Sequence, residues 1–242
     1  MGAVLKILLF ACVAVASARA DLPTQEKVFT IASFTPAKTN YVSADYIFSA
    51  LPFYEPVPES DTIRDYPSHK QAETQQGAIL LRDKTILFFD TRSPKYLEVV
   101  DSSNHSTFYR LAKHPKVRST CPKPPSNLDV IPFPKPEDVF CVAIYPWNQA
   151  KHFTPENLAA ALSRFRPLSE QDVPAKAIVA SSNIGKVFYP KEWDQAQHER
   201  HPEPLNGIIV LTNRAVLKWI TWTPHAIGFS NYRYNTYFVI DE

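Results

Sequence analysis

The fold is decided by residues 77–101, GAILLRDKTILFFDTRSPKYLEVVD, which align without a gap with residues 207–231, GIIVLTNRAVLKWITWTPHAIGFSN. Each copy begins with a glycine. Its seventh residue, Asp83 or Asn213, lies in a polar turn, and a proline, Pro94 or Pro224, follows eleven residues later. With a one-residue shift, TFYRL at 107–111 also matches TYFVI at 236–240. The ordered glycine, turn and proline positions favour an internal duplication over a chance likeness of two strand-rich stretches.

Each copy has the pattern of a β-meander. Short apolar or alternating runs are separated by turn residues, and Asp83 and Asn213 are types that tolerate a left-handed turn backbone. The expected strands are 78–81, 85–90, 96–100 and 107–111 in the first copy, and 208–212, 215–221, 226–230 and 236–240 in the second. We therefore predict a mainly β protein (β-rich α+β) of two tandem β-meander modules that can pack as one pseudo-symmetric unit.

The remaining segments set the predicted domain organisation. Thr154 followed by Pro155 is a good helix start, and Pro167 stops it, which predicts one short helix near 154–166 between the meanders. Residues 41–58 mix aromatics with prolines and are compatible with strand, loop or both. The predicted boundaries are a first β-rich module at 21–118, a proline-rich linker at 119–140 and a second β-rich module at 141–242.

Residues 1–20 have the features of a cleavable export signal. Lys6 precedes an apolar run at 7–16, and Ala18 and Ala20 are the small residues that a signal peptidase reads. The run is too short to span a bilayer, and no later segment comes close to the length needed. We expect a secreted or periplasmic protein cleaved near Ala20, with lipid anchoring at Cys12 as a minor alternative.

Two cysteines, Cys121 and Cys141, remain beyond the signal, and an exported chain permits a disulfide between them. The residues that separate them include six prolines, which rule out a regular helix or a central strand there. We therefore expect a disulfide that closes this linker. Asn104 begins an Asn-His-Ser sequon, a glycosylation site if the host is eukaryotic.

Charge and glycine content exclude two classes of function. Without Lys6 and Arg19, the chain beyond residue 20 holds equal numbers of basic and acidic residues, which gives no support to nucleic-acid binding. Glycine is too scarce for a phosphate-cradling loop, because the whole chain has 5. We expect no nucleotide enzyme and no cofactor.

A candidate metal cluster lies at His198, His201 and Asp194. On a helix, the two histidines would share a face and Asp194 would lie one turn earlier. The pattern is H-E-x-H and not the H-E-x-x-H of zinc proteases, and the run around it is strongly polar. A solvated surface segment is therefore the simpler interpretation.

Aromatic residues form the other candidate site. Tyr232 and Tyr234 would project to one face of a strand, and Trp147 lies in an aromatic pair with Tyr145. Trp222 is expected to be exposed because its counterpart in the first copy is Arg92. Exposed Tyr and Trp suit stacking on sugar rings or anchoring a protein partner, whereas the alternative is that these rings fill the sheet cores.

Two functions follow from these patterns. The first is an exported, non-catalytic β-protein that binds a protein partner or a glycan, at the cell envelope or outside the cell. The alternative is an exported hydrolase, with or without a metal, with a site between the two modules that uses His198, His201 and Asp194. The first needs only strands and aromatics that the sequence contains, so it is the function we expect.

Overall fold

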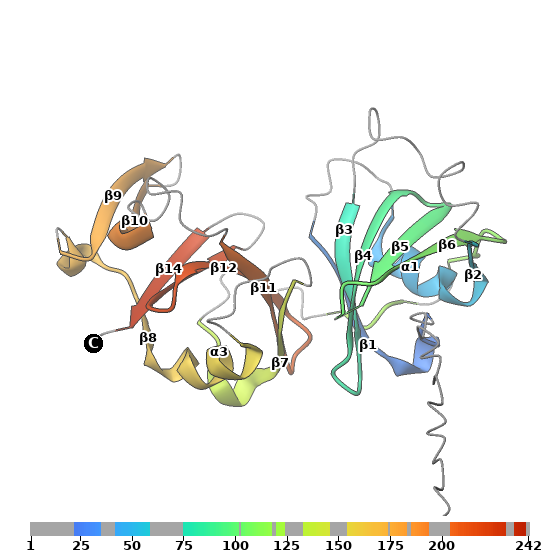
Figure 1. Cartoon of the computed structure of the whole chain (residues 1–242), viewed down its shortest axis with the longest axis horizontal. Coiled ribbons are helices and arrows are strands. Elements are labelled where there is room, and N and C mark those ends of the chain that lie inside the picture. The colour runs from blue at the N-terminus through green and yellow to red at the C-terminus, as the bar shows by residue number, and fades with distance from the viewer. Residues whose placement is uncertain are drawn as a thin grey trace, which may run out of the picture.

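Two six-stranded antiparallel sheets dominate the computed structural model of the chain (Figure 1). The structure describes residues 22–34, 42–58, 75–101, 103–117, 120–123, 133–145, 154–173, 175–182, 185–193, 204–230 and 235–240. The predicted fold class, a mainly β protein with two meander modules, is confirmed.

The first sheet has the strand order β1-β3-β4-β5-β6-β2. Its strands are β1 (Val28–Ser33), β2 (Tyr54–Pro56), β3 (Gln75–Leu81), β4 (Ile86–Ser93), β5 (Tyr96–Val100) and β6 (Ser106–Leu111). Between β1 and β2 lie the helix α1 (Ala44–Ala50) and the 3-10 turn η2 (Leu51–Phe53), and η1 (Gln25–Lys27) precedes β1. The predicted meander is the run from β3 to β6.

The second sheet repeats this topology in the order β7-β11-β12-β13-β14-β8. Its strands are β7 (Val139–Ile144), β8 (Phe165–Pro167), β11 (Leu205–Leu211), β12 (Val216–Thr223), β13 (Ala226–Ser230) and β14 (Asn235–Ile240). The helix α3 (Pro155–Ala161) and η4 (Leu162–Arg164) separate β7 from β8, and η3 (Pro136–Asp138) precedes β7. The duplication therefore extends beyond the aligned sequence to β1 and β7, α1 and α3, and β2 and β8.

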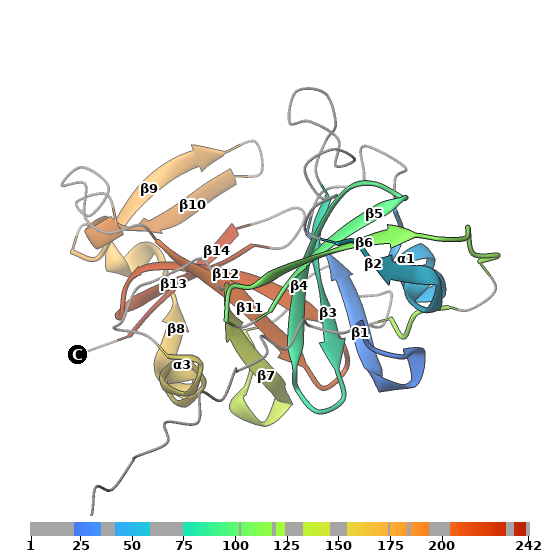
Figure 2. The ribbon, with the colours of Figure 1, turned by 45° about the vertical axis from the view of Figure 1, so that its right-hand side comes forward.

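Among the residues described, one hairpin distinguishes the second module from the first. After β8, η5 (Glu170–Asp172) leads into β9 (Ala177–Ser182) and β10 (Gly185–Pro190), which pair as a separate two-stranded sheet. In Figure 2 this hairpin lies above β13 and β14, on the side of the second module away from α3.

The same local chemistry forms the first hairpin turn of both meanders. The Asp83 carboxylate accepts from the N–H of Thr85, and the Asn213 side chain accepts from the N–H of Ala215. The next residues, Lys84 and Arg214, both have a φ of 72°. Each turn thus needs a side-chain acceptor followed by a left-handed residue, which the aligned DK and NR pairs supply.

The helix α1 corrects the sequence interpretation of residues 41–58, where strand or loop was expected. The Ser43 side chain accepts from the N–H of Tyr46, as the Thr154 side chain accepts from the N–H of Asn157 in α3. Ile47 on α1 is fully buried in the first module's core. Such a short helix is held mainly by this packing, because seven residues are too few for a helix to be stable alone.

Each module buries one face of its sheet beneath its helix. The first core includes Ile47 and Leu51 with Ile79, Leu97 and Val99. The second core includes Leu158 and Leu162 of the helical segment with residues at the matching positions of the second sheet, Ile209, Ile227 and Phe229.

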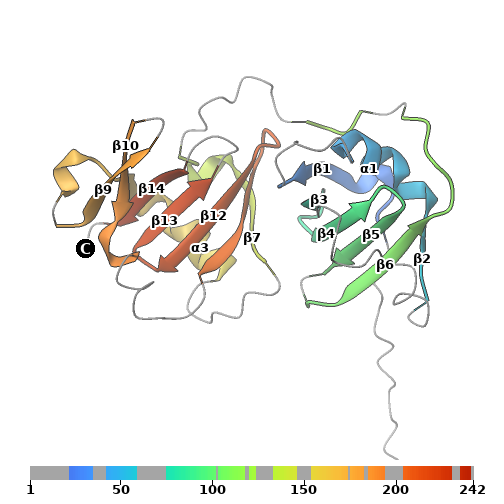
Figure 3. The same cartoon turned by 90° about the horizontal axis from the view of Figure 1, so that it is seen from above.

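The opposite faces of the two sheets pack against each other (Figure 3). Their shared cluster joins Ala78, Leu80 and Phe88 of the first module to Ile208 and Val210 of the second. At its edge the Phe29 and Phe140 rings stack, with centroids 4.2 Å apart.

Two cations flank this stack in a reciprocal arrangement. Arg214 lies over the Phe29 ring at 5.3 Å, and Lys84 lies over the Phe140 ring at 5.8 Å. Lys84 and Arg214 are equivalent in the repeat, as are Phe29 and Phe140, so the modules meet about a local two-fold axis.

The two cysteines do not form the expected disulfide, since both are free thiols. Cys121 is buried in the first module's core, whereas Cys141 lies on β7 in the cluster between the modules. Burial raises the pKa of each thiol to about 11. The sequence shows that the two cysteines flank a proline-rich segment, but not that they pack in different clusters.

Within the residues described, no helix is long and apolar enough to cross a membrane.

Candidate functional site

An aromatic cluster joins the β9–β10 hairpin to the outer face of the second sheet. Trp193, which is 1% exposed, follows β10 and meets Tyr237 of β14 edge-on at 5.5 Å, and Tyr189 of β10 meets the same ring at 5.1 Å. A Cβ on Gly228 would lie 2.9 Å from Tyr237 and 3.1 Å from Trp193. The rings therefore pack directly on the β13 backbone and fix the hairpin to the sheet.

The corresponding face of the first sheet has a different composition. The register of the strands places Asp90 where the second module has Ile220, Glu98 where it has Gly228, and Arg110 where it has Val239. The apolar seat for a hairpin thus belongs to the second module.

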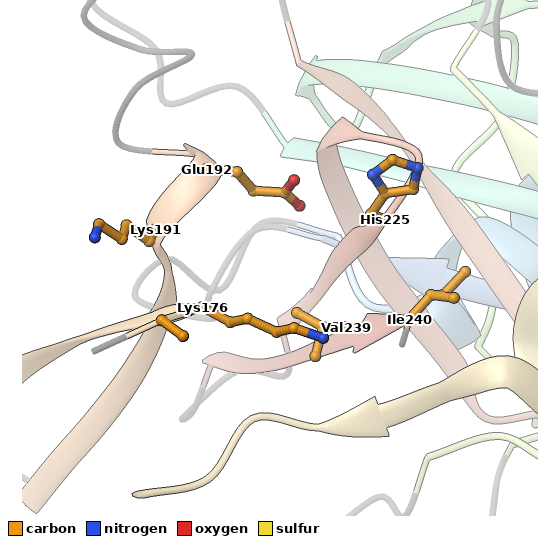
Figure 4. Close-up of a pocket in the computed structure, with 7 residues that line it drawn as sticks. Lys176, Lys191, Glu192, His225, Val239 and Ile240 are labelled. Atoms are coloured by element: carbon orange, nitrogen blue, oxygen red, sulfur yellow. The ribbon is translucent and has the colours of Figure 1, made fainter. Parts of the chain in front are cut away.

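A cavity of about 410 Å³ opens where the hairpin meets the sheet (Figure 4). Its lining comes from three separate parts of the chain: Ala175 and Lys176 before β9, Lys191 and Glu192 after β10, and His225, Val239 and Ile240 from the turn after β12 and from β14. Val239 and Ile240 are buried and form an apolar floor.

Backbone hydrogen bonds hold the walls of this pocket. The N–H of Lys191 donates to the carbonyl of Lys176 at 3.0 Å and so closes the base of the hairpin. The N–H of Ile240 donates to the carbonyl of His225 at 2.8 Å, which ties the turn after β12 to the end of β14.

The polar groups of the pocket are held in different ways. The Thr223 hydroxyl donates to Glu192 Oε1 at 2.6 Å, which fixes the half-buried carboxylate on the wall. In Figure 4 the Lys176 side chain extends toward Val239, the Glu192 side chain extends toward His225, and the Lys191 side chain points away from the other side chains. A ligand here would meet one ammonium, one fixed carboxylate and one imidazole above an apolar floor.

The structure places only some of the predicted site residues. Trp222, expected to be exposed, is half-buried and packs on the aromatic cluster that seats the hairpin. Asn104 is exposed in the turn between β5 and β6, where its φ is 62°. The other candidates lie outside the described residues: Tyr232, Tyr234, Trp147, His198, His201 and Asp194. In the part of the chain that the structure describes, no three His, Cys, Asp or Glu residues gather as metal ligands.

Sequence reasoning missed Lys176, Glu192 and His225. No motif marks them, because they come from three segments that meet only when the hairpin folds back on the sheet. The one local feature of the sequence that relates to the site is the threonine pair at 221 and 223, because the Thr223 hydroxyl holds the Glu192 carboxylate.

Comparison with protein-family models, curated protein sequences and solved structures finds no match for this chain. The fold and the site therefore define a class only: a mainly β protein of two duplicated modules, with a small polar pocket beside the hairpin of the second module.

Proposed function

We propose that the protein is an exported, non-catalytic binding protein whose hairpin pocket takes a saccharide that bears a carboxylate. The observation that carries the proposal is the Glu192 carboxylate, fixed by Thr223 in a pocket that also holds the Lys176 amine. Export is inferred from the signal-like pattern of residues 1–20.

A sugar acid matches each surface of the pocket. Sugar hydroxyls donate hydrogen bonds, and a fixed carboxylate such as Glu192 accepts them. The Lys176 ammonium complements the ligand's carboxylate, and charge-assisted hydrogen bonds are the stronger ones. The C–H face of a sugar ring would lie on Val239 and Ile240. A few fixed polar groups around an apolar surface are typical of small-ligand sites.

The test compares acidic with neutral oligosaccharides of matched length by isothermal titration calorimetry. We expect binding of uronate-containing chains and weaker binding of neutral ones. Lys176→Ala should weaken acidic binding by about tenfold, the effect of losing one charge-assisted hydrogen bond. Lys191→Ala removes the same charge nearby from a side chain that points away, so it is the matched control. Equal affinity for acidic and neutral chains, or equal loss in both variants, would refute the proposal.

The hydrolase alternative is tested with the same sugars. Oligosaccharides incubated with the protein, with and without EDTA, are analysed for chain shortening. Intact chains under both conditions agree with a binding protein. Shortening that EDTA abolishes would overturn the non-catalytic proposal and direct attention to His198, His201 and Asp194.

A further inference from the structure

In the first module, a short extended segment lies along the outer edge of β1. The N–H of Cys121 donates to Asp45 Oδ1 at 2.8 Å, and Lys123 Nζ contacts Asp45 Oδ2 at 2.5 Å. The Thr30 hydroxyl donates to the carbonyl of Pro122 at 2.8 Å. Segment 121–123 is thus bound between the edge strand β1 and the first turn of α1.

The local two-fold axis gives this segment's site an equivalent in the second module. There β7 is the edge strand, as β1 is in the first sheet. Glu156 is the second residue of α3, as Asp45 is of α1, and the register of β7 on β11 places Cys141 where β1 has Thr30. Glu156 is exposed.

Beside these residues the structure has an open groove of about 420 Å³, whose lining includes their chain neighbours Val142 and Pro155. One wall is residues 142–144 of β7 with Pro155 of α3, and the other is residues 84–88 with Asp101 of the first module. Lys84 lies in the wall of this groove. Its equivalent in the repeat, Arg214, lies near Cys121: burial raises the pKa of the Cys121 thiol, and the Arg214 charge partly offsets that rise. The described lining of this groove includes no segment equivalent to 121–123.

We propose that this groove, between β7, α3 and the β3–β4 hairpin, binds an extended peptide of a partner protein in which a proline precedes a lysine. The bound segment 121–123 supplies the template, with Pro122 and Lys123 in that order. Edge strands accept extended peptides because one side of their backbone is not paired within the sheet.

Charge complementarity selects a cationic peptide. Glu156 adjoins the lining residue Pro155 and can receive the peptide's lysine as Asp45 receives Lys123, while Asp101 in the opposite wall offsets the charge of Lys84 there. The peptide groove and the hairpin pocket have no lining residue in common, so this inference does not depend on the proposed function.

The test uses the full chain, labelled with ¹⁵N, and a capped peptide that copies residues 118–124 with serine in place of the cysteine. We expect the largest amide shift changes at residues 142–144 and 156. Glu156→Gln should weaken binding about two- to fivefold, and Glu55→Gln, which changes an exposed glutamate on β2, should not. A peptide with glutamate in place of the lysine should bind more weakly still.

Two results would overturn the proposal. One is the absence of shift changes at residues 142–144 with millimolar peptide. The other is a set of changes centred on β1 and residues 120–123, which would mean that the peptide displaces the resident segment instead of filling the groove. Spectra of Glu156→Gln without peptide establish that the variant is folded before its binding is compared.

Discussion

Replacing Gly207 with alanine should strain the second module where β11 lies between β7 and β12. A Cβ at this position would lie 2.0 Å from the carbonyl oxygen of Ala143 on β7 and 2.6 Å from the Trp219 ring on β12. Ordinary contact begins at 3.4 Å, so the strand or its neighbour must move by more than 1 Å. The obstacle on the β7 side is backbone, which cannot rotate away as a side chain can.

The magnitude follows from two costs. Overpacking of a well-packed interior costs about 1–3 kcal/mol. Separating β7 from β11 also weakens the hydrogen bonds around the Gly207–Ile144 pair, and each bond lost costs about 1 kcal/mol. With one such bond lost, we expect a total loss of about 2–4 kcal/mol in the free energy of unfolding, a large part of the 5–15 kcal/mol that is typical of domains.

Urea unfolding followed by tryptophan fluorescence measures this loss. Gly228→Ala is the matched control, because the three atoms nearest to its Cβ would be side-chain atoms of Tyr237 and Trp193, at 2.9–3.1 Å. It should cost about 1 kcal/mol, since these rings can shift by a few tenths of an ångström. Gly77→Ala repeats the experiment in the first module, where the Ala32 carbonyl lies 2.2 Å from the added Cβ. The reasoning is refuted if Gly207→Ala costs less than Gly228→Ala.

Two further predictions concern buried polar groups. The Thr221 hydroxyl donates a hydrogen bond to the Ala226 carbonyl at 2.5 Å, and Thr91 makes the equivalent bond in the first module. Thr221→Val and Thr91→Val should therefore each lower the free energy of unfolding, measured by urea titration, by about 1–2 kcal/mol. A loss confined to one module would contradict the equivalence. The Arg166 guanidinium lowers the pKa of Asp172 to about 2, so the stabilisation from this pair is complete above about pH 4 and is lost as the pH falls toward 2. Asp172→Asn should cost about 2 kcal/mol at pH 7 and less at pH 2, as thermal unfolding across that range would reveal; an unchanged cost at pH 2 would refute the assignment.

The meanders were predictable because their strands are neighbours in sequence. Alternating apolar residues, the Asp83 and Asn213 turns and the glycines together define four successive strands in each copy. The strands β1 and β7 pair with partners far along the chain, so local patterns do not reveal where they add to the sheets.

The site was not predictable for the same physical reason. Lys176, Glu192 and His225 become neighbours only through the packing of the hairpin on Tyr237 and the sheet. We expected Trp222 to be exposed because its counterpart is Arg92, but Trp222 packs on a cluster that half-buries it and that, among the described residues, belongs to the second module alone. Equivalence in a repeat predicts backbone position well and side-chain surroundings poorly.

The local two-fold axis also determines how many ligands one molecule can hold. In a dimer of identical chains, every surface feature occurs twice, so a groove would be filled in both halves or open in both. When the two halves belong to one chain, they need not be identical. Segment 121–123 lies against β1 in the first module, whereas the groove beside β7 in the second module is open. Among the described residues, the β9–β10 hairpin belongs to the second module alone. The expected stoichiometry is therefore one saccharide and one peptide per chain, at two sites that can be occupied independently.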